Sequence, residues 1–401
     1  MRSYFVQGSL LNKKSYHKNV IVASVLVLNT FSWLYLTLAI LNTFSESAFK
    51  TDVLTYFYLF ISISSVLGVF LSRRIKRLKF LCLWVSLGAA ISFLSAFISF
   101  QGCVSYVLSS LLGLAVGVGM PSCLAFYADC TSIENRGKIS GITLCATNLI
   151  VFPLSSLTMF LSQDLSFIFS GTWRLFILII IIILKPRDIH YSKNSISKSI
   201  AELIKQRRFI LYFTPWILFL FVDRICGALL ERPLLEAVFG SLSSLIAGYL
   251  ADNFGRKRTV ICGFIGLGIA YGVFSLTPDS MLARYFHFII DGISAGILFV
   301  AFTLILWADL SRHELREEAY MIGNILFFPT RILTIMLPLY VTFPPVNAIF
   351  SLASFFLFLA VIPLMYAPET LPEKLIRRRE LEKYVEKAKK IREKYEKQKE
   401  D

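Results

Sequence analysis

Twelve long apolar stretches dominate the 401-residue chain, and they constrain its fold more than any other feature. A helix needs about 20 mostly apolar residues to cross the hydrocarbon core of a bilayer. The alternating pattern of outer-membrane strands is absent, so an all-α membrane protein with twelve transmembrane helices is predicted. The predicted spans are 20–41, 53–71, 80–100, 104–127, 139–161, 166–184, 209–230, 233–251, 259–276, 281–307, 320–341 and 346–366.

The composition narrows the functional class. Hydrophobic residues make up 56% of the chain and charged residues 17%, whereas soluble domains have about 45–50% and about 25%. This composition excludes disorder, a disulfide scaffold and most cytosolic enzymes. The seven cysteines form no C-x-x-C motif, no phosphate-binding loop or Ser/His/Asp constellation stands out, and four histidines are too few for a metal centre. We therefore expect a multi-pass membrane protein that is not an enzyme and has no cofactor or bound metal.

The basic residues behind the net charge of +15 are unevenly distributed between the two sides of the predicted spans. With an even number of spans both termini lie on one side, and 35 of the 41 Lys and Arg residues then fall on that side. The positive-inside rule makes this side cytoplasmic, which removes nucleic acid as the explanation of the charge. The first apolar run is too long for a signal peptide, so it is expected to be retained. The six other basic residues are Lys50, Arg174, Arg224, Arg232, Arg284 and Arg331.

The chain also contains an internal repeat. A shift of 180 residues aligns Ser64-x3-Gly68 with Ser244-x3-Gly248, and it aligns Ala128-Asp129 with Ala308-Asp309. It predicts six-helix bundles at 20–184 and 209–367, related by an axis along the membrane normal. Such bundles around a central cavity are the architecture of a transporter that works by alternating access. The remaining segments are 1–19, a basic cytoplasmic linker at 185–208 and a charged tail at 368–401.

Several motifs resemble those of the major facilitator superfamily. Gly248-Tyr-Leu-Ala-Asp252-Asn-Phe-Gly255-Arg256-Lys257-Arg258 resembles its signature loop, which lies between the second and third helices of a half. Asp129 to Arg136-Gly137 and Asp309 to Arg316 resemble the acid-x6-arginine loops of its sugar-porter-like branches. Trp173-Arg174 and Pro368-Glu369-Thr370 resemble two further motifs. The resemblance covers residues 18–372 and implies gradient-driven transport, in a sugar-porter or organic-ion-transporter branch.

The resemblance implies that the cytoplasmic loops form a gate. The first signature loop departs from the pattern, because Ser72 stands where the acid belongs and Ile75 where the glycine belongs. In the family that acid helps to latch the cytoplasmic side, so gating in the first half is expected to be weaker or different. The predicted gating residues are Gly248, Asp252, Gly255, Arg256, Lys257, Arg73, Asp129, Arg136, Asp309 and Arg316.

Charged residues at bilayer depth cost at least about 2.5–3.5 kcal/mol and need an explanation. Arg331 lies near the middle of 320–341, with Asn324 on the same face, and 281–307 carries a stripe that includes His287 and Asp291. At about 1.5 Å per residue, Asp291 and Arg331 lie at similar depth. They either form a structural ion pair or line a cavity, where Arg331 binds an anionic group while Asp291 and His287 take a proton. We favour the second interpretation.

Other polar and aromatic residues complete the candidate set. The predicted substrate-binding residues are Arg331, Asn324, Asn29, Trp33, Asn148 and Trp216. Arg174 lies beside Trp173 and is expected to reach the headgroups, with a deeper position and a role in substrate binding as the alternatives. Asp223 and Arg224 are expected to form a pair at the outer rim, with Glu231, Arg232 and Glu236 nearby. The first helix has no carboxylate, which disfavours proton coupling at that position.

The tail has a helical pattern of its own. Residues 372–401 are rich in Lys and Glu and carry apolar residues at three-to-four spacing, namely Leu381, Tyr384, Val385, Ala388, Ile391 and Tyr395. This pattern predicts a cytoplasmic amphipathic helix that is solvated, lies on anionic lipid or pairs with a partner helix.

Taken together, these observations predict a secondary transporter in the plasma membrane, with both termini cytoplasmic. Its expected cargo is a small organic solute, an anionic metabolite moved by proton symport or by facilitated diffusion. The alternatives are a neutral sugar porter, a drug/proton antiporter, or a non-transporting sensor or scaffold on the same fold.

Overall fold

The computed structural model of the chain describes residues 13–43, 47–98, 100–188, 196–230 and 233–400. The first half, residues 13–184, contains α1 (Lys13–Leu41), α2 (Ser47–Ser72), α3 (Arg77–Phe97), α4 (Gly102–Gly117), α5 (Met120–Cys130), α6 (Arg136–Leu157) and α7 (Gln163–Leu184). The second half, residues 207–366, contains α9 (Arg207–Gly227), α10 (Leu234–Asn253), α11 (Arg256–Leu276), α12 (Met281–Phe299), the π-helix η1 (Val300–Ile305), α13 (Leu306–Leu310), the short 3₁₀ helix η2 (His313–Leu315), α14 (Arg316–Asn324), α15 (Pro329–Tyr340), α16 (Val346–Leu359) and α17 (Val361–Tyr366).

The predicted fold class is confirmed. Twelve helical segments in the described residues are long and apolar enough to cross a membrane, and each coincides with one predicted span. Large apolar side chains are exposed along these segments, such as Ile182 and Ile183 on α7, each 69% exposed. A bilayer can cover such side chains, since lipid tails are as apolar as they are.

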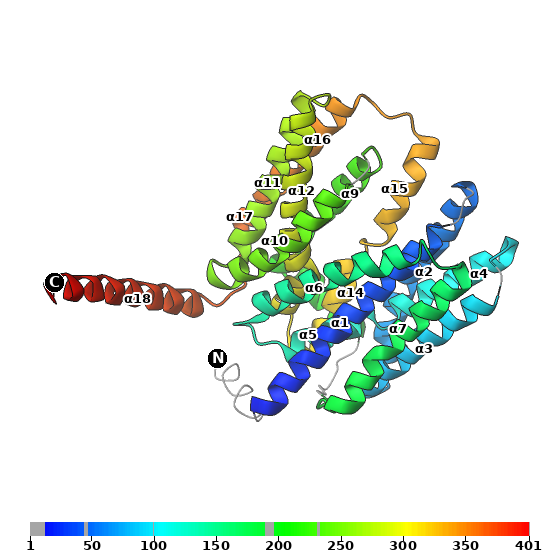
Figure 1. Cartoon of the computed structure of the whole chain (residues 1–401), viewed down its shortest axis with the longest axis horizontal. Coiled ribbons are helices and arrows are strands. Elements are labelled where there is room, and N and C mark those ends of the chain that lie inside the picture. The colour runs from blue at the N-terminus through cyan, green and yellow to red at the C-terminus, as the bar shows by residue number, and fades with distance from the viewer. Residues whose placement is uncertain (1–12, 44–46, 99, 189–195, 231–232, 401) are drawn as a thin grey trace.

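The two halves pack against each other at one end and separate at the other. Figure 1 shows the helices of the two halves converging near the chain termini and spreading apart with distance from them. At the converging end α6 packs on α10 and α14 packs on α5. Farther along the eleventh span, α15 packs on α2. The interface between the halves is therefore closed on the side of the termini.

Three spans are interrupted near the centre of the molecule. The fourth breaks between α4 and α5, where the Trp84 indole donates a 2.5 Å hydrogen bond to the Ala115 carbonyl. The tenth contains the π-helix η1, and the eleventh breaks between α14 and α15, just before Pro329. Carbonyls released from helical bonding need other partners, and Trp84 supplies one.

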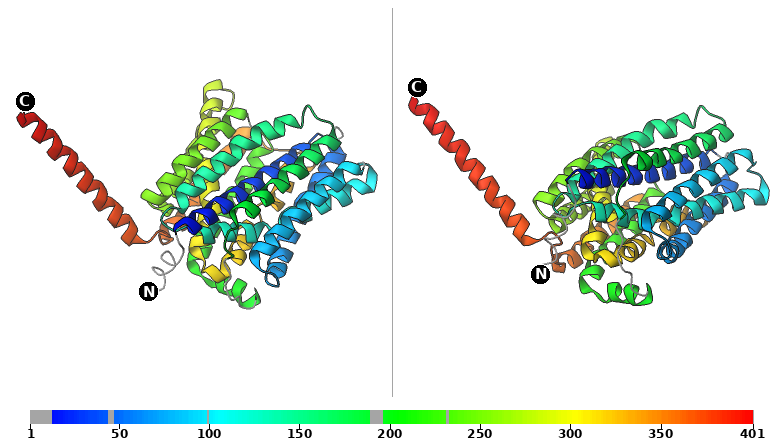
Figure 2. Two further views of the ribbon diagram at one scale, coloured as in Figure 1. Left: turned by 60° about the horizontal axis from the view of Figure 1, so that its bottom comes forward. Right: turned by 90° about the horizontal axis from the view of Figure 1, so that it is seen from below.

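Two further helices lie outside the spans. The helix α8 (Ile196–Lys205) belongs to the linker between the halves and packs against α9 and α14. The helix α18 (Glu373–Glu400) forms the tail and projects beyond the bundle as one long rod (Figure 2). In α18 the Lys390 ammonium lies 2.8 Å from Glu386, and this hydrogen bond holds the pKa of the Glu386 carboxyl below its usual range.

Candidate functional site

The two halves are joined by reciprocal ion pairs at the end where they converge. Arg136 of the first half pairs with Asp309 of the second, and Arg316 of the second half pairs with Asp129 of the first. All four side chains are at most 6% exposed. Because each half contributes one acid and one arginine, the halves cannot separate here without breaking both pairs.

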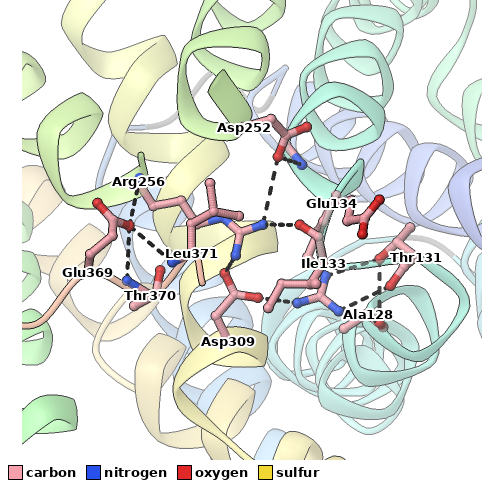
Figure 3. Close-up of polar contacts among 12 residues, drawn as sticks. Ala128, Thr131, Ile133, Glu134, Asp252, Arg256, Asp309, Glu369, Thr370 and Leu371 are labelled. Atoms are coloured by element: carbon pink, nitrogen blue, oxygen red, sulfur yellow. Dashed lines mark hydrogen bonds and ion pairs between the residues drawn. The ribbon is translucent and has the colours of Figure 1, made fainter. Parts of the chain in front are cut away.

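Each of these acids also binds an arginine of its own half. Asp129 pairs with Arg77, and Asp309 pairs with Arg256. Figure 3 shows Asp309 beside Arg256, which also donates a 2.7 Å hydrogen bond to the Ile133 carbonyl across the interface. We call the six residues Arg77, Asp129, Arg136, Arg256, Asp309 and Arg316 the latch. Asp129 and Asp309, like Arg136 and Arg316, are related by the 180-residue repeat, whereas Arg77 and Arg256 are 179 residues apart.

Asp252 holds the two halves together in a different way. Its carboxylate is fully buried and accepts hydrogen bonds from the backbone N–H groups of Gly137, at 2.9 Å, and Lys138, at 2.8 Å. These groups belong to the first turn of α6, where the helix dipole favours a negative charge. A carboxylate from the second half therefore caps a helix of the first.

The first half lacks the corresponding acid, and the second half supplies it. Under the 180-residue shift Ser72 corresponds to Asp252, and Glu317 corresponds to Gly137. The Ser72 hydroxyl donates a 2.5 Å hydrogen bond to Glu317, which also binds Arg77 at 3.0 Å. The next residue, Glu318, pairs with Arg73. The acid at this interface thus comes from the second half and not from the first signature loop.

Glu317 and Glu318 were not among the predicted gating residues. Both are at most 2% exposed, although they begin a membrane span. Their signal was present in the sequence, because two acids at positions aligned with Gly137 and Lys138 are unusual at a membrane-span start.

The segment after the last span braces the signature loop. Gly255 has φ +102°, a conformation that favours glycine, and it places the N–H groups of Arg256 and Lys257 toward Glu369. The Glu369 carboxylate accepts from Arg256 at 2.9 Å (Figure 3) and from Lys257 at 3.1 Å. Further along, the Arg379 guanidinium donates to the Asp252 carbonyl and, at 2.7 Å, to the Glu134 carbonyl. Arg379 therefore joins the two halves at the end where they converge.

A cavity of about 290 Å³ lies between the halves, lined by side chains of both. The side chains that line the cavity are mainly aromatic and aliphatic. The lining includes residues at all three interrupted spans. The polar side chains in the wall are few, and among the described lining residues Glu236 is the one charged group. They include Tyr35, Thr147, Asn148, Glu236, Ser241, Ser244, Thr303 and Asn324.

The structure divides the predicted substrate-binding residues. Asn148 and Asn324 line the cavity. Asn29, Trp33 and Trp216 are at most 1% exposed and lie behind its wall. The Trp33 indole donates to Ser92 at 3.1 Å, and the Trp216 indole donates to the Gly323 carbonyl at 2.9 Å.

Arg331 stands beside the cavity and not in its wall. Its guanidinium lies 5.8 Å from the ring centre of Phe327, which does line the cavity. The Arg224 guanidinium lies 5.5 Å from the same ring. Two cations therefore contact one cavity-lining aromatic side chain. No salt bridge joins Arg331 to Asp291 in the described part of the chain, where Asp291 is buried on α12, so the alternative of a structural pair between them is not supported.

The expected pair of Asp223 and Arg224 forms in the last turns of α9, but it is buried instead of exposed at a rim. Asp223 and Arg224 do pair, at 2.8 Å, but each is only 2% exposed within the helix bundle. Burial follows from packing, because Arg224 contacts Phe327 while its carbonyl accepts a hydrogen bond from Thr334 at 3.3 Å. Glu231 and Arg232 lie outside the described residues, and Glu236 lies in the cavity wall.

His287 and Asp291 are buried on α12 and do not line the cavity. The His287 ring lies among aromatic rings of α11 and α16, 4.9 Å from Tyr271 and 5.4 Å from Phe350. The cavity instead meets the small residues of α12, such as Gly292 and Gly296.

Arg174 is fully buried and does not reach the headgroups. One guanidinium nitrogen donates to Asn29 and to Thr30, each at 2.9 Å. The guanidinium lies over the rings of Trp33, at 4.7 Å, and Trp84, at 4.3 Å. In the described residues it makes no ion pair, so neutral acceptors and aromatic faces hold this cation. Trp173 donates to Ser32 at 2.8 Å, which keeps the Trp–Arg pair turned inward.

Comparisons with known proteins agree with this architecture. The sequence model of the Major Facilitator Superfamily matches residues 234–395. The human organic anion transporter MFSD10 (TETRAN) superposes with a TM-score of 0.67 at 13% identity, covering 87% of this chain and 99% of its own. The proton:xylose symporter XylE, bound to 6-bromo-6-deoxy-D-glucose, gives a TM-score of 0.66 at 14% identity, covering 90% and 97%. No curated protein matches the sequence.

Proposed function

We propose that this chain, which belongs to the major facilitator superfamily, carries a small organic solute across a membrane by alternating access between its two halves. It is a multi-pass membrane transporter and not an enzyme. The observation that carries the mechanism is a cavity lined by both halves, with ion pairs between the halves at one end only. A solute in such a cavity is reached from the end where the halves separate.

In the proposed mechanism the latch is intact in one state of the transporter and broken in the other. With the termini on the cytoplasmic side, as the charge distribution predicts, the described state is closed to the cytoplasm and outward-facing. Opening to the cytoplasm must separate Arg136 from Asp309 and Arg316 from Asp129. Removing one partner of a buried ion pair costs about 3–5 kcal/mol, because the other charge stays buried without compensation. The separated acids and arginines of the latch must therefore become hydrated as the latch opens.

The favoured cargo is an organic anion with an apolar body. Arg331 and Arg224 both contact Phe327 at the cavity wall, and guanidinium groups suit carboxylates and phosphates. The aromatic and aliphatic wall suits the rest of such a solute. The similarity to a human organic anion transporter supports this cargo at the level of fold.

One observation favours a second candidate. Glu236 is the charged residue that contacts the cavity, and a carboxylate there suits a cationic or hydrogen-bond-donating solute. This group supports a drug/proton antiporter or a sugar porter. The proposed proton symport depends on an acid that the solute can influence, and Glu236 is better placed for this than Asp291 or His287. Residence in the plasma membrane and tail contacts with anionic lipid or a partner helix are further parts of the proposal.

Uptake into proteoliposomes tests these candidates. Purified protein is reconstituted and offered carboxylates, phosphates, sugars and organic cations, with and without a pH gradient. Anion uptake that falls at least tenfold in Arg331→Gln, and stays unchanged in the control Arg284→Gln, supports the anion site. Arg284 is the matched control because it is an exposed arginine of the second half.

The other outcomes are equally distinct. Cation or sugar uptake lost in Glu236→Gln but kept in Arg331→Gln favours the second candidate. Accumulation that ignores the pH gradient contradicts proton coupling. Binding of solutes without any transport would favour a sensor and contradict the proposed function.

A further inference from the structure

The helix α18 carries an apolar stripe that nothing in the described structure covers. Leu381, Tyr384, Val385 and Ile391 are between 54% and 71% exposed. The helix leaves the bundle directly after the last span and then projects beyond it (Figure 1). An exposed apolar stripe on a helix so close to the last span indicates a binding surface for a lipid or a protein.

The charge of α18 indicates which kind of surface or molecule covers this stripe. The helix contains twelve Lys or Arg and seven Glu residues. Four of the basic residues, Lys374, Arg377, Arg378 and Arg379, follow the last span almost directly. A basic cluster immediately beyond a transmembrane helix is the usual signature of binding to anionic lipid headgroups. Apolar side chains flanked by basic ones suit the boundary between headgroups and acyl chains.

A second copy of α18 fits the charges less well. Leu381, Tyr384, Ala388 and Ile391 follow the a and d spacing of a coiled coil. In a parallel dimer, however, Lys387 would face Arg392 of the second helix at the flanking positions. Like charges at these positions oppose pairing, whereas an anionic surface attracts both.

The same helix contacts residues of both halves next to the latch with its opposite face. Arg379 donates to the Glu134 carbonyl of the first half and to the Asp252 carbonyl of the second. At about 100° per residue, Leu381, Tyr384, Val385 and Ile391 are separated from Arg379 by roughly 120–160° around the helix axis. While Arg379 faces the latch, the stripe therefore faces away from the bundle. A rotation that places the stripe on the bilayer must withdraw Arg379.

We infer that α18 binds the anionic surface of the cytoplasmic leaflet, and that this binding withdraws Arg379 from the latch and favours opening to the cytoplasm. The inference rests on the proposed function for the role of the latch, but not for the lipid contact. Anionic lipid then acts as a regulator of the transporter. In a neutral bilayer Arg379 keeps bridging the halves, and the outward-facing state predominates.

The experiment uses the full chain in nanodiscs of phosphatidylcholine alone or of equal parts phosphatidylcholine and phosphatidylglycerol. Limited trypsin digestion reports contact of α18 with lipid, because its Lys and Arg residues are cleaved when the helix is free. Maleimide labelling of Cys130, followed by peptide mass spectrometry, reports opening of the latch. Cys130 is 3% exposed beside Asp129, and the exposed Cys103 is the internal reference.

We expect cleavage in α18 to slow about tenfold in the anionic discs, and Cys130 labelling to rise about fivefold. High salt must abolish the protection, because screening weakens contacts with headgroups. In Arg379→Gln, Cys130 labelling in neutral discs must rise to the level of the anionic discs. The matched control is Arg378→Gln, which removes the same charge one residue earlier, where the partner is Glu382 of the same helix at 2.9 Å.

Three results would overturn the inference. Equal cleavage in both lipids rules out the anionic surface as the occupant. Protection that is independent of lipid charge, in protein that sediments as a dimer, assigns the stripe to a second copy. Lipid protection with the same Cys130 labelling in Arg379→Gln and Arg378→Gln removes the connection to the latch. None of these readouts requires a transported solute, so a wrong proposed function would leave the lipid contact testable.

Discussion

The Ser72 hydroxyl donates a 2.5 Å hydrogen bond to the carboxylate of Glu317, at the place where the other half uses Asp252. The two interfaces are related by the 180-residue repeat, but their acids stand at different positions of the repeat. One acid, Asp252, belongs to a signature loop, and the other, Glu317, begins the helix that faces such a loop. In one, a carboxylate of the second half caps α6. In the other, a carboxylate of the second half receives Ser72 and Arg77 of the first. The second half therefore supplies the carboxylate in both.

This relationship predicts that Ser72→Asp weakens the latch. The new carboxylate would face Glu317 in a buried site, and like charges so placed cost several kcal/mol. We expect Cys130 labelling in neutral nanodiscs to rise at least tenfold. The double variant Ser72→Asp with Glu317→Gly rebuilds the arrangement of Asp252 and Gly137, and it should recover most of the closed state. Equal labelling of the single and double variants would contradict this account.

The shared acids of the latch predict a large loss of stability. Asp309 binds Arg136 and Arg256, so Asp309→Asn leaves two buried arginines without their carboxylate. The expected cost is about 3–5 kcal/mol, seen as a lower thermal midpoint in detergent. Asp129→Asn should behave alike, because Asp129 binds Arg77 and Arg316. The control is Glu382→Gln, since Glu382 makes only an exposed pair with Arg378, and such pairs contribute at most about 1 kcal/mol.

The close crossing of α6 and α10 predicts a steric opening of the latch. A Cβ atom on Gly137 would lie 2.5 Å from both the Gly248 carbonyl oxygen and the Asp252 carboxylate. Backbone cannot give way at this distance, so Gly137→Ala must push the halves apart. We expect increased Cys130 labelling and a lower thermal midpoint. Gly272→Ala is the matched control, because the nearest atom is a Ser354 hydroxyl at 3.2 Å. Similar behaviour of the two variants would show that the crossing tolerates a methyl group.

Periodicity and charge predicted the fold, because twelve apolar runs have few alternatives in a bilayer. The internal repeat and the resemblance to the acid-x6-arginine loops identified Asp129, Arg136, Asp309 and Arg316, which the structure brings together. Which residues line the cavity could not be read in the same way. Trp33 and Asn148 look equally suitable in sequence, yet only Asn148 lies in the wall. The rotation of each helix about its axis decides this, and a span that is apolar on all sides leaves that rotation undetermined.

Arg174 was misjudged for a related physical reason. An arginine near an interfacial tryptophan usually extends toward water, but here two tryptophans enclose it from both faces. Glu236 was likewise expected near the outer mouth, yet α10 brings it to the cavity wall. In both cases the deciding partners come from other helices, which no local pattern specifies.

The enclosed Arg174 predicts that lysine cannot replace it. A guanidinium is planar and stacks on Trp33 and Trp84 while it donates to Asn29 and Thr30. An ammonium is more strongly hydrated and cannot stack on both rings, so burial costs it more. We expect Arg174→Lys to destabilise the protein by about 2–4 kcal/mol, from lost cation–π contacts and hydrogen bonds to a charged donor.

The comparison that decides this point is Arg174→Lys against Arg174→Gln, measured by thermal unfolding in detergent. Glutamine keeps a donor for Asn29 but brings no charge into the bundle. If the buried charge is tolerated only because of the planar stack, Arg174→Gln must be more stable than Arg174→Lys. The reverse order would show that the positive charge itself holds this core together, with the aromatic faces accepting any cation.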